Sequence, residues 1–235
     1  MKAKSRPAKR GGGAARVRHQ ILVVDDHPIV RQGLRRLIDQ QRDLMVCGEA
    51  ESPREAEAAI RRLRPDLVVI DVSLKNGDGI ELVKDARARN PKLPILVLSM
   101  HDETIYAERM LAAGANGYIM KQAAPDQLLV ALRCVLEVGI YVSELVGSGM
   151  IRKLSSGGRH VSSNPIECLS NRELQILQMI GCGQSTRQAA EALSLSKKTV
   201  ESHRQRIKRK LNLATGSQLI QYAVSWSARA AVGAA

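Results

Sequence analysis

Short apolar runs alternate with amphipathic segments through the first half of the chain. The runs are rich in Val, Ile and Leu, and the segments between them repeat apolar positions three and four residues apart. Continuous apolar runs are typical of strands buried on both faces, so the alternation predicts a parallel sheet with helices on both sides. The predicted strands are residues 21–24, 44–50, 66–70, 95–99 and 117–120, and the predicted helices are residues 29–38, 54–63, 79–88, 103–113 and 126–138.

These strand–helix units predict an α/β fold, a flavodoxin-like doubly wound five-stranded parallel sheet. We expect this domain to span residues 19–140. Proline favours the first turn of a helix, and Pro28, Pro53 and Pro125 stand at predicted helix starts. Gly114 directly follows the fourth predicted helix, which indicates a C-cap.

A second unit follows a change in composition. Residues 147–168 lose the helical periodicity and are rich in Gly, Ser, Asn and Pro, which predicts a linker, and we place it at residues 141–168. Ser170 and Glu173 then have the spacing of a capping box at the start of a helix. Further amphipathic segments follow with a tight turn between the second and third. Residues 169–235 therefore predict a small all-α helix-turn-helix domain.

Positive charge is concentrated at the two ends of the chain, whose formal net charge is +13. Residues 1–18 hold seven Lys or Arg and no acidic residue, and residues 170–235 hold ten against three. Residues 19–169 are nearly neutral. A basic domain beside a neutral body is typical of polyanion binders, most simply of nucleic-acid binders, whereas the alternative is a protein that is merely basic.

The N-terminal residues 1–18 lack the apolar core of a secretory signal. Glycines 11–13 would break the helical face of an organelle transit peptide, so we expect a disordered basic tail with weak nonspecific attraction to DNA. No apolar run approaches the length of a membrane span, and the four cysteines lie far apart without CxxC spacing. The sequence therefore predicts a cytoplasmic protein with no membrane partner, zinc site or disulfide framework.

Polar groups stand where the predicted strands end. Asp25 and Asp26 follow the first strand, Asp71 the third, Ser99 closes the fourth and Lys121 follows the fifth. The carboxyl ends of parallel strands share one edge, so these groups form one site. Crowded carboxylates repel unless a hard cation gathers them, and oxygen ligands suit Mg²⁺. With a lysine beside them, they predict phosphoryl transfer onto a carboxylate.

With these motifs in this order, residues 20–138 resemble the receiver domain of bacterial two-component response regulators, and the whole chain resembles the NarL/FixJ group with a LuxR-type helix-turn-helix. The resemblance implies that Asp71 accepts a phosphoryl group from a sensor histidine kinase. It also implies Mg²⁺ ligands and residues that sense the phosphate or switch conformation. The implied ligands are Asp25, Asp26, Asp71 and the backbone carbonyl of Ser73, and the implied sensing and switch residues are Ser99, Lys121 and Tyr118.

The long third helix of the second domain, with its N-cap at Ser194 or Ser196, is the predicted recognition helix. On a helical wheel, Val200, Ile207 and Leu211 share the packing side. The opposite side predicts DNA contacts, with glutamine and glutamate suited to base edges and cations suited to phosphates. The candidates for base contacts are Glu201, Ser202 and Gln205. The other DNA-contact candidates, which suit phosphates or lie on the same outward face of the helix, are Lys197, Lys198, Thr199, Arg206, Arg209 and Lys210.

The LuxR-type resemblance also implies a homodimer on two half-sites of double-stranded DNA. The implied pairing residues of the last helix are Leu219, Ile220, Tyr222 and Ala223. The chain departs from the family pattern at Gln188 and Ala189, where Glu and Ile are usual. The smaller Ala189 predicts less core beneath the helix-turn-helix.

The sequence thus predicts a phosphorylation-controlled DNA-binding transcription regulator. The resemblance implies that its unphosphorylated receiver covers the recognition helix. One alternative is a DNA-binding regulator that uses its receiver as a dimerisation module independently of phosphorylation. A phosphatase with an aspartate nucleophile would need a second aspartate two residues after Asp71. Ser73 stands there, so we expect no enzyme of that kind.

Overall fold

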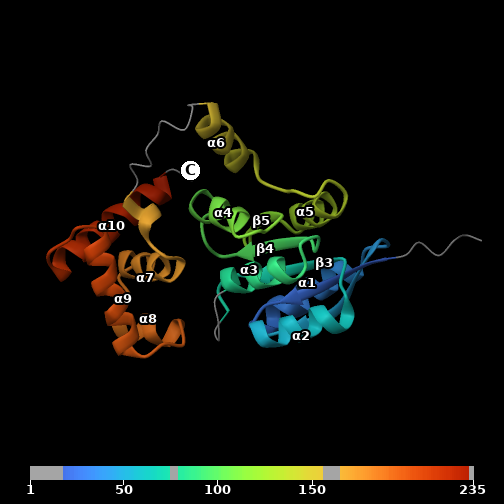
Figure 1. The fold of residues 1–235 in the computed structure, drawn as a ribbon, viewed down its shortest axis with the longest axis horizontal. Helices are drawn as coiled ribbons and strands as arrows, with labels where there is room; N and C mark the ends of the chain where they lie inside the picture. The colour runs from blue at the N-terminus through green and yellow to red at the C-terminus, as the bar shows by residue number, and fades with distance from the viewer. Residues whose placement is uncertain (1–17, 75–78, 156–164, 233–235) are drawn as a thin grey trace, which may run out of the picture.

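The structure of the protein, a computed structural model, describes residues 18–74, 79–155 and 165–232. Nearly all of the predicted basic tail, residues 1–17, and part of the predicted linker, residues 156–164, lie outside the described residues. Figure 1 shows an α/β domain beside a helical domain. No helix within the described ranges is both long and apolar enough to cross a membrane.

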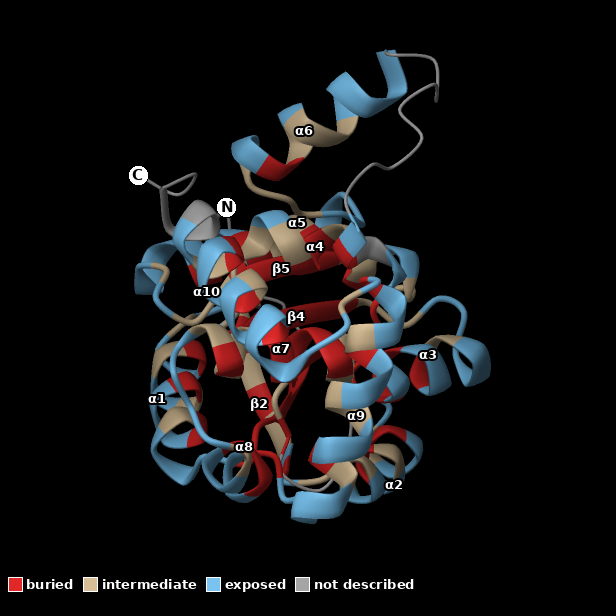
Figure 2. Ribbon diagram, turned by 90° about the vertical axis from the view of Figure 1, so that its left-hand side faces the viewer, coloured by how far each residue is buried: buried red, intermediate tan, exposed pale blue. Residues whose placement is uncertain are grey.

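The first domain is built on five parallel strands in the order β2-β1-β3-β4-β5. This order confirms the predicted flavodoxin-like sheet. Burial colours in Figure 2 show the strands in the interior, as their continuous apolar runs require. The strands are β1 (His19–Val24), β2 (Leu44–Ala50), β3 (Leu67–Asp71), β4 (Ile95–Ser99) and β5 (Gly117–Met120).

Two layers of helices cover the sheet because alternate strand residues point to opposite faces. Ile21 and Val69 pack with α1 and α5 on one face, whereas Leu22 and Ile70 pack with α2, α3 and α4 on the other. The helices begin and end within two residues of the predicted bounds. They are α1 (Pro28–Asp39), α2 (Pro53–Leu63), α3 (Gly79–Arg89), α4 (Glu103–Ala112) and α5 (Pro125–Glu137).

Local signals set these helix ends. Pro28, Pro53 and Pro125 each occupy the first turn of their helix, where the missing N–H removes no hydrogen bond. Gly114 follows α4 with φ at +106°, a conformation that glycine adopts without strain. The predicted proline starts are therefore confirmed, whereas the C-cap of α4 is Ala113 and Gly114 is the residue after it.

The segment predicted as a linker contains a helix that the periodicity did not indicate, α6 (Glu144–Ser155). This helix packs on α4, where the Lys153 ammonium lies 2.6 Å from the Glu108 carboxylate. Gly147 and Gly149 weaken helix propensity within it. Contact with α4 explains why a weak local helix former is ordered here.

The second domain consists of α7 (Asn171–Gly181), α8 (Thr186–Ala192), α9 (Lys197–Lys210) and α10 (Gly216–Val232), preceded by a short 3₁₀ helix η1 (Pro165–Cys168). This arrangement confirms the predicted helix-turn-helix.

Side-chain caps begin the helices of this domain. Ser170 and Glu173 form the predicted capping box at α7. Ser185 and Gln188 form a second one at α8, and Ser196 caps α9. Gln188, a departure from the family pattern, therefore performs the capping role that glutamate would perform.

Candidate functional site

Three carboxylates and one ammonium meet at the carboxyl edge of the sheet. Asp25 and Asp26 follow β1, Asp71 ends β3, and Lys121 follows β5. The Lys121 Nζ lies 2.6 Å from Asp25 Oδ2 and 2.8 Å from Asp71 Oδ2. All three carboxylates are buried, with at most 9% of each residue exposed. The structure therefore brings together the strand-end residues that the sequence predicted as one site.

Burial and charge compete at this edge. Burial raises the pKa of Asp71, and the Lys121 ammonium opposes that rise without cancelling it. Burial lowers the pKa of Lys121, but the carboxylates of Asp71 and Asp25 outweigh burial, so the lysine stays protonated. One ammonium among three buried carboxylates leaves the cluster short of positive charge.

The donor set fits a hard divalent cation. Ligand atoms of Asp25, Asp26, His27 and Asp71 all lie within 4.8 Å of one another. Carboxylate oxygens at this spacing are the ligands that Mg²⁺ accepts, and a cation among them would relieve their repulsion.

His27 is a member of this cluster that the sequence analysis missed. Its backbone N–H donates to Asp25 Oδ1 at 2.8 Å, and its Nδ1 lies 3.0 Å from Asp26 Oδ1. The residue directly follows the aspartate pair and precedes Pro28, the start of α1. Its position between an acidic pair and a helix-starting proline was the available signal.

The loop after β3 orients Asp71. The backbone N–H of Ser73 donates to Asp71 Oδ1 at 3.0 Å, so this residue already touches the carboxylate through its amide. Gly79 opens α3 against the same loop, where an added Cβ would lie 2.5 Å from the carbonyl oxygen of Asp71. Only glycine permits so close an approach.

Ser99 and Tyr118, the predicted sensing and switch residues, both hold His101. The backbone N–H of His101 donates to Ser99 Oγ at 3.1 Å. The Tyr118 hydroxyl donates to the carbonyl oxygen of His101 at 2.7 Å. Burial raises the pKa of Tyr118, so its hydroxyl stays protonated and able to donate. His101 is thus the residue through which both side chains meet.

His101 also joins the two domains. Its Nε2 lies 3.1 Å from Ser73 Oγ, and its Nδ1 lies 3.0 Å from Gln178 Oε1 on α7. The ring stacks on Tyr106 with 4.6 Å between centroids. Burial lowers the pKa of His101, which keeps the ring neutral and leaves one nitrogen to donate and one to accept.

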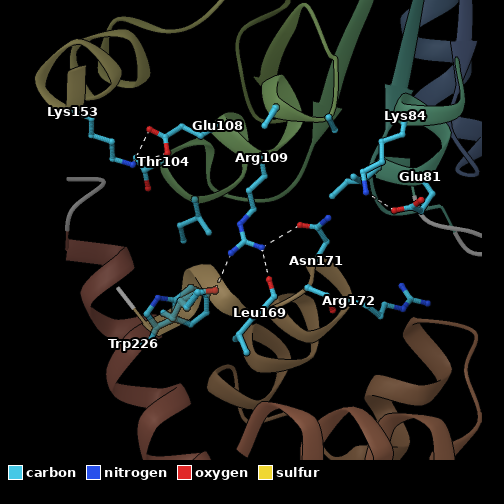
Figure 3. Close-up of a pocket in the computed structure, with 16 residues that line it drawn as sticks. Glu81, Lys84, Thr104, Glu108, Arg109, Lys153, Leu169, Asn171, Arg172 and Trp226 are labelled. Carbon is cyan, nitrogen blue, oxygen red and sulfur yellow. Dashed lines mark hydrogen bonds and ion pairs between the residues drawn. The ribbon is translucent and has the colours of Figure 1, made fainter. Parts of the chain in front are cut away.

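Arg109 on α4 makes a second junction between the domains (Figure 3). Its guanidinium donates to the carbonyl oxygens of Leu169 and Ile166 at 2.8 Å and 2.9 Å. A further contact reaches Asn171 Oδ1 at 3.3 Å. These groups hold the start of α7 against the first domain.

The expectation that the receiver covers the recognition helix is corrected by this arrangement. The interdomain hydrogen bonds reach α7 and the residues before it, because Gln178 and the chain around Leu169 offer matching acceptors. The candidates for base contacts on α9 are exposed, as are most candidates for phosphate contacts. The exposed residues are Lys197, Lys198, Glu201, Ser202, Gln205, Arg206, Arg209 and Lys210, and Thr199 is half-buried.

Lys210 has a different environment from the other DNA candidates. Its Nζ lies 2.7 Å from Glu173 Oε2 and donates to the carbonyl oxygen of Cys168 at 3.0 Å. The Glu173 side chain is buried, so Lys210 compensates its charge. The helical wheel could not indicate this pairing, because Glu173 belongs to α7.

Two of the predicted dimerisation residues are corrected as well. Leu219 and Ala223 are fully buried between α10 and α7 and belong to the core of the domain. Tyr222 is half-buried, whereas Ile220 is 48% exposed. Val224, which the sequence analysis did not name, is 49% exposed. The exposed apolar positions of α10 are thus fewer than predicted because one face packs inward.

Comparison with known families gives one match in each of the two domains. Residues 21–133 match the response regulator receiver domain, and residues 167–223 match the bacterial regulatory proteins of the luxR family. The acidic edge lies in the first match, and the helix-turn-helix in the second.

Two curated proteins are similar to this chain across both domains. The chain is 34% identical to oxygen regulatory protein NreC of Staphylococcus epidermidis over 210 residues, which is 87% of this chain and 96% of NreC. It is 30% identical to transcriptional regulatory protein DegU of Brevibacillus brevis over 214 residues, 86% of this chain and 91% of DegU.

Among solved structures, RcsB of Salmonella enterica serovar Typhimurium, bound to promoter rprA with the phosphomimetic BeF₃⁻, is 28% identical. Its TM-score is 0.58, and the match covers 88% of this chain and 98% of RcsB. The chain therefore belongs to the NarL/FixJ-type response regulators, with a receiver domain followed by a LuxR-type DNA-binding domain.

Proposed function

We propose that Asp71 is the phosphoryl acceptor of this response regulator and that a sensor histidine kinase in the cytoplasm is its donor. The observation that carries the assignment is Lys121, whose ammonium touches both Asp25 and Asp71 in a buried cluster. Such a lysine supplies a point charge for phosphate oxygens beside the accepting carboxylate.

In the proposed reaction an Asp71 carboxylate oxygen forms a bond to phosphorus while the bond from phosphorus to the donor breaks with its electron pair. Asp25, Asp26, Asp71 and the backbone carbonyl of Ser73 would hold Mg²⁺, which when bound supplies positive charge for the transferred group. The Ser73 amide fixes the orientation of the carboxylate. Lys121 stabilises the negative charge that develops on the phosphoryl oxygens.

Ser99 and Tyr118 would couple the acceptor to the rest of the receiver. Ser99 Oγ accepts a hydrogen bond from the His101 backbone N–H, and its O–H would donate to a phosphoryl oxygen on Asp71, which would draw the side chain away from His101. Loss of this contact would free the His101 loop, which Tyr118 also holds. A phosphoryl group would then shift the population between two loop conformations.

The second domain would bind double-stranded DNA as a homodimer, with α9 in the major groove. Glu201, Ser202 and Gln205 would read base edges, since all three are exposed on one face. Ile220 and Val224 on α10 offer exposed apolar area for pairing. The proposed phosphate contacts are Lys197, Lys198, Thr199, Arg206 and Arg209.

The test of the acceptor is intact mass after incubation with acetyl phosphate and Mg²⁺. We expect wild type to gain the mass of one phosphoryl group and Asp71→Asn to gain none. Asp85→Asn, which removes an exposed carboxylate on α3, is the matched control and is expected to behave as wild type. A gain in Asp71→Asn equal to that of wild type would contradict the assignment.

Exposure of the α9 side chains while α7 is docked on the receiver favours a second candidate, DNA binding that is independent of phosphorylation. In that case Asp71→Asn would leave DNA affinity unchanged both with and without acetyl phosphate. Fluorescence anisotropy of labelled DNA distinguishes the two candidates.

A further inference from the structure

The DNA-binding domain lies across the entrance to the proposed phosphorylation site. A hollow of about 320 Å³ separates the acidic edge from α7 and α8. Asp26, His27 and Ser73 line it from the receiver, and Gln178 and Cys182 line it from the second domain. Access to Asp71 from this side therefore passes between the two domains.

Two contacts hold α7 over this hollow. Gln178, two turns into the helix, meets His101 at 3.0 Å directly beside the acidic edge. At the start of the helix, Arg109 reaches the carbonyl oxygen of Leu169 and the side chain of Asn171 (Figure 3). Because the contacts lie at different points along α7, they fix its orientation as well as its position.

The size of the hollow decides which donors fit. A volume of 320 Å³ is at the lower end of small-ligand pockets and holds about ten waters, enough for a small acyl phosphate. A protein donor carries its phosphohistidine on an element such as a helix about 10 Å across. Docking such a partner buries about 800 Å² on each protein. A partner that approached Asp71 through this hollow would overlap α7, which lines it.

We propose that the docked DNA-binding domain admits small phosphoryl donors to Asp71 and excludes protein phosphohistidine donors until α7 leaves the receiver. The proposal rests on the proposed function of Asp71 as acceptor. With acetyl phosphate the P–O bond to acetate breaks as the bond to the Asp71 oxygen forms. With phosphohistidine the P–N bond breaks and imidazole leaves with the electron pair.

Competition for one surface links donor binding to domain separation. A protein donor that binds only the open form shifts the population toward the open form. The apparent affinity of the donor is its intrinsic affinity multiplied by the fraction of chains that are open. Kinase binding would itself separate the domains. Small donors would phosphorylate the chain without that step.

The test uses the full chain with both anchoring contacts removed, Arg109→Ala with Gln178→Ala. Neither residue belongs to the acidic cluster. Arg187→Ala is the matched control, since it removes an exposed arginine of α8 that pairs with Glu191. Trp226, the only tryptophan in the chain, lines a second cavity between the domains, beside Arg109 and α4, so its emission reports on separation. We expect a red-shifted emission maximum in the double variant alone.

Initial rates of Asp71 phosphorylation are then measured with acetyl phosphate and with a purified phosphohistidine phosphotransfer domain. The initial rate of the double variant with the protein donor is expected to be about tenfold that of wild type. This factor corresponds to a wild-type docked state that is populated about nine-tenths of the time, so that only about one chain in ten is open. The rate of the double variant with acetyl phosphate is expected to stay within about twofold, because docking leaves small donors unimpeded.

Three outcomes would overturn the proposal. The first is an equal rate with the protein donor in wild type and double variant, which includes the case in which neither is labelled. The second is an equal gain in rate with both donors. The third is an unchanged Trp226 emission maximum in the double variant. Failure of acetyl phosphate to label Asp71 in any form would instead contradict the proposed function. The two failures are therefore distinguishable.

Discussion

At the scale of single residues, Lys121 sets the electrostatics of the acidic edge. Its ammonium lies within 2.8 Å of both Asp25 and Asp71, and its side chain is only 9% exposed. A buried cation at this position lowers the cost of keeping Asp71 ionised and ready to act as a nucleophile. The same charge would meet the phosphoryl group as it arrives.

Replacing Lys121 by glutamine should therefore slow phosphorylation of Asp71. We expect the initial rate with acetyl phosphate to fall about 100-fold, the usual effect of removing one preorganised group that stabilises negative charge in the transition state. Intact mass against time measures the rate. Lys92→Gln, at an exposed position after α3, is the control and should leave the rate unchanged. Equal rates in the two variants would remove Lys121 from the proposed mechanism.

At the scale of elements, the start of α7 depends on Glu173. Its carboxylate accepts from the backbone N–H of Ser170 at 2.7 Å and pairs with Lys210 on α9. Burial raises the pKa of Glu173, but the Lys210 and Ser170 donors outweigh it and hold the pKa below its ordinary value of 4.5. One side chain thus ties the helix cap to the recognition helix.

A carboxyl group whose pKa is lowered by folding stabilises the folded state above its unfolded pKa, and the contribution is lost as the pH falls through the folded pKa. Glu173→Gln should therefore lower the free energy of unfolding by about 1–3 kcal/mol at neutral pH and by much less in acid. Urea unfolding followed by circular dichroism measures both. Glu191→Gln, in an exposed pair with Arg187, is expected to have little effect at either pH. An equal loss at both pH values would refute the ionic role.

At the scale of the whole molecule, the basic DNA-contact candidates and the contacts with the receiver lie on different helices of the second domain. The receiver region is close to neutral and the second domain carries the basic recognition helix. Because α7 rather than α9 faces the receiver, the candidate DNA contacts remain exposed in the docked form. Regulation would then act on separation and pairing of domains as much as on access to α9.

Two substitutions on α9 should have distinguishable effects on DNA binding. Arg206→Ala should weaken binding to every sequence and reduce the slope of log affinity against log salt by about one, because it removes one phosphate contact. Gln205→Ala should cost about 1–3 kcal/mol on the target site and little on random DNA. Anisotropy titrations at several salt concentrations measure both. A sequence-specific loss for Arg206→Ala would reverse the assignments.

Much of the first domain follows from local sequence. Alternate residues of a strand point to opposite faces, so runs such as 66–70 identify buried strands without knowledge of their partners. Parallel strands then bring their carboxyl ends to one edge, which is why Asp71 and Lys121 could be assigned to one site from spacing alone. Caps such as Ser170 with Glu173 need only three residues and were equally readable.

Contacts between distant segments could not be read in this way. His101 and Gln178 are 77 residues apart, and their hydrogen bond depends on how two separately folded domains meet. Leu219 and Ala223 suit a core as well as a dimer surface, and only packing against α7 decided between them.

The sequence by itself determined the two folds and the residues of the acidic edge, because periodicity and strand ends are properties of near neighbours. Only the tertiary structure decided that α6 forms, that Lys210 compensates Glu173 and that α7 lies over the acidic edge. These outcomes depend on complementarity between surfaces far apart in the chain, which local patterns of hydrophobicity and charge do not encode.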